Sequence, residues 1–157
     1  MVLTLLSMLA FAGNSLLCRA AFNSSRIDAA SFTAIRVASG AAALLVIVRM
    51  RGGRLESAGN WTSAFALFAY AAAFSYAYVS LTAATGALLL FGAVQATMIG
   101  FGLYLGERLH GWQIAGLVCA LLGLVGLLLP GLAAPSLQGS VLMLAAGVAW
   151  GVYTLRG

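Results

Sequence analysis

The chain has 157 residues, of which 63% are hydrophobic and only 7% are charged, and its mean hydropathy is +1.06. A soluble domain carries about 25% charged and about 45–50% apolar residues, so this composition excludes a water-soluble globule, and it also excludes a disordered chain. The apolar stretches are long runs rather than short alternating strands, which argues against a porin-like barrel. The composition therefore predicts an all-α, polytopic transmembrane helix bundle that has the lipid bilayer as its surroundings.

The charged residues are unbalanced and few. Eight basic residues, all arginine, stand against three acidic ones, for a net charge of +5. The arginines are too scattered to form a phosphate-binding face, so no nucleic-acid partner is expected. Cys18 and Cys119 lie inside apolar stretches as small buried residues do. His110 has no ligand partner at a recognisable spacing, so neither a metal nor another cofactor is expected.

Six apolar segments follow one another along the chain. A bilayer core of about 30 Å requires a helix of roughly 20 apolar residues. Segments of or near this length cover residues 2–22, 29–48, 61–81, 83–105, 112–129 and 139–155. The first has a small-residue stretch like a signal-peptide cleavage site, but no basic residue precedes it, which favours a retained helix. A tight turn near Leu81 and Thr82 is expected between the third and fourth segments.

Arginine placement predicts the orientation of these segments. If all six cross the membrane, one side holds five arginines, and the other holds Arg26, together with Arg19 if that side chain extends outward. Positive charge favours the cytoplasm, so both termini are expected there. The five arginines on the predicted cytoplasmic side are Arg49, Arg51, Arg54, Arg108 and Arg156.

Small residues recur at four-residue spacing in five of the six segments. Helices in lipid associate through close van der Waals contact, which small residues permit, so the rows predict a compact bundle. Trp61, Trp112 and Trp150 lie near the predicted cytoplasmic ends, where an interfacial aromatic belt is expected. Clear examples of the small-residue rows are Ala30–Ala34–Ala38–Ala42, Gly92–Ala96–Gly100 and Gly116–Ala120.

Four polar side chains inside the apolar runs are candidate substrate-binding residues, because polar groups at membrane depth are costly. Arg36 lies seven residues, or about 10 Å, into the second segment. Its guanidinium could extend to the outer headgroups, bind an anionic or carbonyl-bearing group in a wet cavity, or brace helices against Asn14 or a backbone carbonyl. Asn14 and Gln95 suit either substrate contact or a helix–helix hydrogen bond. Tyr76 could line a cavity, anchor at the interface or pack against a neighbouring helix.

No carboxylate lies deep in any segment: Asp28 and Glu107 stand at segment ends, and Glu56 stands in a connection. A proton relay centred on a buried carboxylate is therefore not supported. No nucleophile, base and orienting group occur together either, so the sequence does not predict an enzyme and offers no catalytic residue.

Several short motifs occur in a fixed order along the chain. They are G-N-S at residues 13–15, I-R-V at 35–37, T-G-A-L-L-L at 85–90, L-G-E-R-L at 105–109, Q-I-A-G at 113–116 and L-G-L-V-G at 122–126. In order and spacing they resemble the first half of the EamA-type transporters of the drug/metabolite transporter superfamily. The resemblance implies a ten-helix carrier built from two inverted five-helix halves around a central cavity, which typically exports amino acids, other metabolites or drugs.

By this resemblance, Asn14, Arg36 and Gln95 would lie near the cavity. Residues 1–130 would form one five-helix EamA-type repeat, and residues 131–157 a periplasmic loop and the first helix of an incomplete second repeat. Many members have a proline in the fourth segment, where this chain has A-V-Q-A at residues 93–96, so a kink there is in doubt.

Two functional hypotheses follow. The first is a truncated or half-sized EamA-type transporter, an exporter of small metabolites or drugs in the bacterial inner membrane, which works with a second copy or a separate second half. The alternative is a non-transporting membrane assembly or interaction subunit that uses the small-residue faces. The substrate is not predicted.

Overall fold

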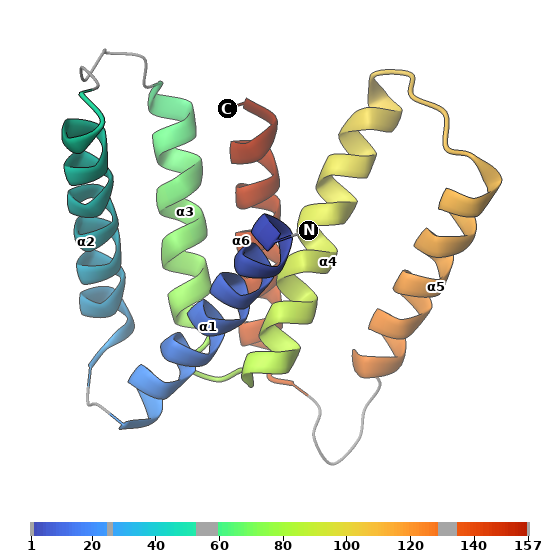
Figure 1. Ribbon diagram of the computed structural model, residues 1–157. Coiled ribbons are helices and arrows are strands. Elements are labelled where there is room, and N and C mark those ends of the chain that lie inside the picture. Colours follow the sequence, from blue (N-terminus) through green and yellow to red (C-terminus); the bar gives the residue numbers. More distant parts are fainter. Residues whose placement is uncertain (1, 25–26, 53–59, 129–134, 157) are drawn as a thin grey trace.

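A computed structural model describes residues 2–24, 27–52, 60–128 and 135–156. Within these ranges every regular element is a helix (Figure 1), as the composition predicts. Arg26, Arg54, Glu56 and the end of the fifth predicted segment lie outside the described residues. The six helices are α1 (Val2–Ser24), α2 (Ala29–Met50), α3 (Trp61–Ala77), α4 (Ala83–Tyr104), α5 (Gly111–Leu128) and α6 (Leu137–Arg156).

Four of the described helices, α1, α2, α4 and α6, are long and apolar enough to cross a bilayer. The other two are shorter: α3 has 17 residues, and α5 has 18. The sixth segment is longer than predicted, because α6 has 20 residues.

The third predicted segment, in contrast, ends four residues early, at Ala77. Tyr78 and Leu81 stand in the turn that follows, and both are completely buried. A buried turn is as apolar as a helix, so hydropathy did not reveal the boundary.

The bundle is built around α3, α4 and α6, and α6 packs against both of the others. Figure 1 shows α2 beside α3 at one side of the bundle, α5 beside α4 at the other, and α1 crossing obliquely in front of the centre. The ends of α2, α4 and α6 and the starts of α3 and α5 lie at one end of the bundle, at the top of the view. The described arginines that the sequence places on the cytoplasmic side therefore share one end.

Glycines allow the central helices to approach closely. A Cβ atom on Gly147 of α6 would lie 2.6 Å from the backbone oxygen of Leu90 in α4, and one on Gly151 would lie 2.8 Å from the side chain of Thr97. Gly100 and Gly116 have no atoms this close: a Cβ on either would meet nothing within 4 Å. Gly147 and Gly151 thus serve the α4–α6 contact, while Gly100 of α4 and Gly116 of α5 face open space.

The L-G-E-R-L motif ends α4. Gly106 has a φ of 90°, a left-handed conformation that glycine adopts without a steric penalty. The Gly106 N–H donates to the Leu103 carbonyl, and the Glu107 N–H donates to the Gly102 carbonyl, both at 3.0 Å. These two bonds form a Schellman motif, which reverses the chain toward α5. The helix begins after His110, whose N–H donates to the side-chain oxygen of Gln113 at 2.8 Å.

Candidate substrate-binding site

Arg36 turns toward α3 rather than toward the headgroups. Its Nη2 donates a hydrogen bond of 2.9 Å to the hydroxyl oxygen of Tyr70. The centre of the guanidinium lies 4.3 Å from the centroid of the Phe74 ring and 5.3 Å from that of Tyr70. Cation–π contacts of this kind stabilise a desolvated cation by about 2 kcal/mol. The arginine therefore braces α2 against α3, but through aromatic partners instead of the Asn14 side chain or backbone carbonyl considered from the sequence.

The second terminal nitrogen of Arg36 is incompletely satisfied. Nη1 is buried and has no hydrogen-bond partner among the residues that the structure describes. A buried donor without an acceptor costs about 1–3 kcal/mol, and more when it belongs to a charged group. This unpaired N–H is a chemically active feature inside the bundle.

Aromatic rings from four helices meet beside this arginine. The Trp150 ring of α6 lies 5.3 Å from Tyr70, 5.2 Å from Phe11 of α1 and 5.9 Å from Phe91 of α4. We call these four residues the ring cluster. The sequence placed Trp150 in an interfacial belt, whereas the structure packs it among the other rings, because α6 runs between α3 and α4. The position of Trp150 along its own segment did not predict contacts with rings from three other helices.

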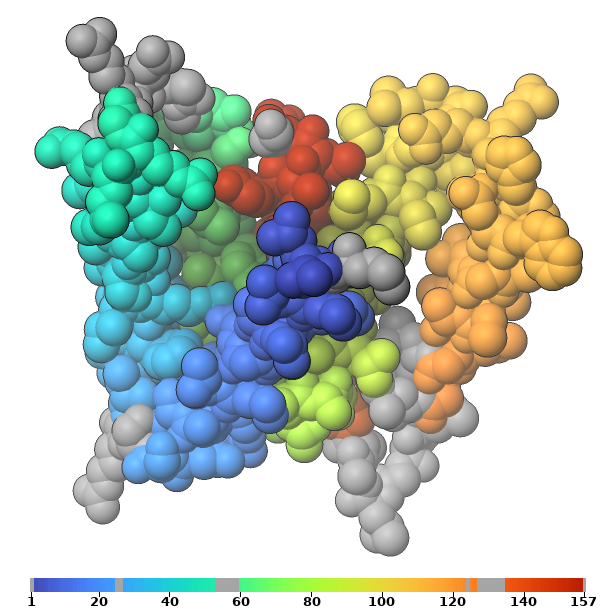
Figure 2. Space-filling model, viewed as in Figure 1, coloured from blue at the N-terminus to red at the C-terminus, as the bar shows by residue number. Residues whose placement is uncertain are grey.

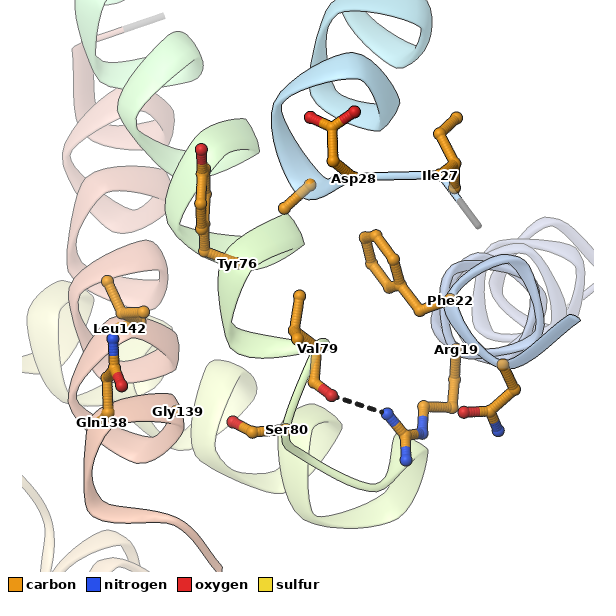
Figure 3. Close-up of a pocket in the computed structure, with 12 residues that line it drawn as sticks. Arg19, Phe22, Ile27, Asp28, Tyr76, Val79, Ser80, Gln138, Gly139 and Leu142 are labelled. Carbon is orange, nitrogen blue, oxygen red and sulfur yellow. Dashed lines mark hydrogen bonds between the residues drawn. The ribbon is translucent and has the colours of Figure 1, made fainter. Parts of the chain in front are cut away.

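A cavity of about 500 Å³ opens where α1 ends, α2 begins, α3 ends and α6 begins. Tyr76, 49% exposed, lines it together with Phe22, Asp28 and Gln138 (Figure 3). Tyr76 thus lines a cavity, which is one of the three positions considered from the sequence. Phe22 also contacts the Phe32 ring, with centroids 5.0 Å apart, and Phe32 lies one helical turn before Arg36 on α2. The aromatic pair therefore links the lining of this outer cavity to the face of α2 that carries Arg36.

Arg19 closes one wall of the outer cavity. Its Nη1 donates to the carbonyl oxygens of Tyr78 and Val79 at 3.0 and 3.1 Å, and Figure 3 shows the bond to Val79. These carbonyls follow the C-terminus of α3, where the helix dipole favours a cation. Arg19 therefore does not extend freely outward, as considered from the sequence, but ties α1 to the end of α3.

Of the other two candidate residues, Gln95 lies apart from this region. Gln95 is exposed on α4 and lines an apolar crevice of about 240 Å³ between α4 and α5, with Leu88 and Leu117 among its neighbours. Figure 2 shows the surface hollowed where α4 and α5 diverge. Asn14 is half-buried on α1, one residue before the buried Ser15. The structure thus does not bring the four candidates into one site.

Sequence reasoning did not select Tyr70 and Phe74, which contact Arg36, or Trp150, which contacts Tyr70. Tyrosine and phenylalanine are ordinary in apolar helices, so their residue types gave no signal. Tyr70 and Phe74 are four residues apart and share one face of α3, but only the packing of α2 shows that this face meets an arginine. Taken together, Arg36 offers an unpaired hydrogen-bond donor, and the ring cluster offers an apolar surface that reaches it through Tyr70.

These features define a multi-pass helical membrane protein that has a cationic, aromatic-lined interior. A model of the EamA-like transporter family matches residues 1–129. The chain therefore belongs to the EamA-like transporter family, a family of small-molecule membrane transporters within the drug/metabolite transporter superfamily.

A related protein matches the whole of this chain. An uncharacterized protein of Pseudomonas aeruginosa is 60% identical over 158 aligned positions, which include all of this chain and 55% of the relative. The chain thus spans about half the length of the curated relative that it matches. No solved structure matches the chain.

Proposed function

We propose that this chain is one half of an exporter that carries small metabolites or drugs out of the cell across the bacterial inner membrane. Arg36 carries the proposal: a permanent cation lies inside an apolar bundle, partly held and partly free to bind. Intramembrane charges are costly, and in transporters they mark substrate or ion pathways. The family assignment supports transport of a small molecule, while the outward direction is our inference.

The orientation that we propose keeps both termini in the cytoplasm. Its support is that the ends of α2 and α6 share one end of the bundle with the α4–α5 turn, and these carry Arg49, Arg51, Arg108 and Arg156. Trp61 and Trp112 begin α3 and α5 and are 92% and 91% exposed, as an aromatic belt requires. The outer cavity then faces the periplasm.

We also propose that transport requires a second half, either a separate chain or a second copy. The relative is nearly twice as long as this chain. The open space at Gly100 and Gly116 leaves room for another helix to approach. In the domain organisation that we propose, α6 belongs to the second repeat in sequence while packing inside the first.

An accumulation assay tests export. The chain is expressed in cells together with the part of the Pseudomonas relative that this chain does not cover. The cells are exposed to a panel of labelled metabolites and drugs, and the intracellular label is measured. We expect lower accumulation of at least one compound, and loss of this effect in Arg36→Gln but not in Arg51→Gln, which removes an exposed charge from the end of the same helix. Unchanged accumulation of every compound, with both segments in the membrane, would contradict the proposal.

The alternative, a non-transporting assembly subunit, is favoured by one observation, the exposed glycines of α4 and α5. Enlarging Gly100 and Gly116 to leucine would then abolish partner binding, while Arg36→Gln would leave partner binding and every other phenotype unchanged. If the chain is an exporter, Arg36→Gln must instead abolish the lower accumulation of the exported compound.

A further inference from the structure

We infer that the substrate recognised at Arg36 is an organic anion, whose carboxylate or similar oxyanion pairs with Nη1 and whose planar apolar body lies against the ring cluster. This inference rests on the proposed transport function and names the substrate class for the same site. Three observations carry it: the uncompensated charge of Arg36, the unpaired N–H, and the adjoining rings.

The positive charge of Arg36 has no counter-ion in the described part of the chain. Arginine stays protonated at every accessible pH, so it cannot escape burial by losing a proton. Asp28 stands eight residues earlier at the start of α2, about 12 Å along the helix, and caps the helix by accepting from the Ser31 N–H at 2.9 Å. Glu107 stands at the opposite end of the bundle, after α4. Neither acid neutralises the guanidinium.

The unpaired nitrogen distinguishes an anion from a neutral ligand. The Tyr70 hydroxyl already satisfies Nη2, while Nη1 lacks an acceptor among the described residues. A neutral carbonyl would satisfy the N–H but leave the charge uncompensated. A carboxylate would do both, and its charge-assisted hydrogen bond is roughly twice as strong as a neutral one.

The rings beside Arg36 favour a planar apolar body. Tyr70 belongs to both features, because its hydroxyl holds Arg36 and its ring contacts Trp150. Trp150 in turn contacts Phe11 and Phe91, which line an apolar cavity of about 300 Å³ with Met8. Aromatic faces and edges pack well against other planar groups. The apolar body of a substrate whose oxyanion pairs with Arg36 would lie against this wall.

Helix α1 covers this region and has much unpacked surface. Its buried residues are Ser15 and Cys18, and Arg19 holds its end to α3, while Leu5 and Leu9 are exposed. Figure 2 shows α1 lying across the front of the bundle. Displacement of its N-terminal part would break few buried contacts, and it would move Phe11 away from Trp150 and open that side of the Trp150 ring to a ligand.

Binding of three matched probes tests the inference. Benzoate, benzamide and benzylamine share a phenyl ring and differ in charge. Binding to the purified full chain in detergent is followed by Trp150 fluorescence in a Trp61→Phe, Trp112→Phe background, because these two substituted tryptophans lie at exposed helix starts. We expect benzoate to bind at least ~10-fold more tightly than benzamide, given about 1.5–3 kcal/mol for a hydrogen bond to a charged group.

Variants assign the preference to Arg36. Arg36→Gln should bind benzoate and benzamide equally, Arg36→Lys should keep part of the preference, and Arg51→Gln should match the parent chain. Circular dichroism confirms that each variant is helical, and the lysine variant decides the matter if the glutamine variant does not fold.

Three results would overturn the inference: equal binding of benzoate and benzamide by the parent chain, tighter binding of benzylamine, or no benzoate binding by the folded chain. Because this assay measures binding alone, it can fail while the accumulation assay still shows export of another substrate class. Conversely, anion binding without any export would contradict the proposed function and leave the binding inference intact.

Discussion

The ring of Tyr78 lies directly against the α-carbon of Gly86, so that a Cβ atom at position 86 would stand 2.5 Å from Cε1 of the tyrosine. Tyr78 is completely buried, and its hydroxyl donates to the Ala83 carbonyl at 3.3 Å. The ring therefore cannot move away easily. This contact joins the turn after α3 to the first part of α4, where the T-G-A-L-L-L motif stands, so the glycine of that motif has a packing role.

Gly86→Ala should consequently destabilise the protein by about 1–3 kcal/mol, the usual cost of overpacking a filled core. The thermal midpoint in detergent, followed by circular dichroism at 222 nm, measures the effect. Gly100→Ala is the matched control on the same helix, because a Cβ there meets nothing within 4 Å. Equal midpoints for the two variants would contradict this account of the turn.

The two glycines of α6 should differ in their tolerance of alanine. At Gly147 a Cβ would lie 2.6 Å from a backbone oxygen of α4, whereas at Gly151 it would lie 2.8 Å from the side chain of Thr97. Rotation about χ1 can move the Cγ2 of Thr97 but not its Cβ, which is also 2.8 Å away, so the clash at Gly151 is relieved in part. At Gly147 the backbone of α4 must shift. We expect Gly147→Ala to cost about 2–3 kcal/mol and Gly151→Ala about 1 kcal/mol. Thermal midpoints in the reverse order would show that α4 moves more easily than Thr97 rotates.

Removing the Arg19 side chain should loosen the attachment of α1. Arg19→Gln loses two charge-assisted hydrogen bonds to the carbonyls after α3, so we expect a loss of about 2 kcal/mol. Arg108→Gln removes an exposed arginine from the α4–α5 turn and should be neutral within about 0.5 kcal/mol. Chemical denaturation in detergent micelles gives both values, and similar stabilities for the two variants would mean that Arg19 contributes no net interaction.

Acid should weaken the N-terminal cap of α2. Hydrogen bonds from the hydroxyl and backbone N–H of Ser31 lower the pKa of Asp28 below its ordinary value of 3.8. The folded-state pKa lies below the unfolded value of about 3.9, so the cap contributes fully above the unfolded pKa. Its contribution is lost as the pH falls through the folded pKa.

The thermal midpoint of the parent chain should therefore drop more between pH 7 and pH 3 than that of Asp28→Asn. Asparagine also caps helices well but does not titrate, so the two proteins should have similar midpoints at pH 7. If the thermal midpoints of the two proteins fell equally with pH, the ionised Asp28 carboxylate would contribute no stability to the folded state.

Single cysteines can check the proposed orientation. In a Cys18→Ala, Cys119→Ser background, a membrane-impermeant maleimide applied to intact cells should label Asn23→Cys at the end of α1 and spare His110→Cys before α5. Both positions are next to exposed helix ends, so access to each depends only on its side of the membrane. Labelling of His110→Cys alone would place the termini outside.

The helices were predictable within a few residues, because hydropathy and capping residues act locally. Asp28 and Asn60 begin α2 and α3 by accepting the N–H groups of Ser31 and Ser63, and Gly106 ends α4. The end of α3 was not predictable, since the turn that holds Tyr78 is as apolar as the helix before it. The turn after α3 depends on two residues outside it. Arg19 of α1 donates to its carbonyls, and Gly86 of α4 leaves room for the Tyr78 ring.

The candidate site was only partly predictable. The rarity of charge in lipid singled out Arg36. Gln95 and Tyr76 line separate cavities, which could not be predicted, because a polar residue inside an apolar run does not indicate which helix face meets its neighbours. Tyr70 and Trp150 lie 80 positions apart in the chain and were invisible to any local pattern.

The amino-acid sequence alone determined the membrane environment, the number and order of the helices, and the resemblance to the family. Apolar run length, arginine placement and motif order are properties of the linear sequence. Tertiary structure alone decided which glycines are in close contact, which aromatic rings hold Arg36, and that one of its nitrogens remains unpaired. Those properties depend on how helices far apart in the chain pack against each other, and small or apolar residues that look alike in sequence become distinct only through that packing.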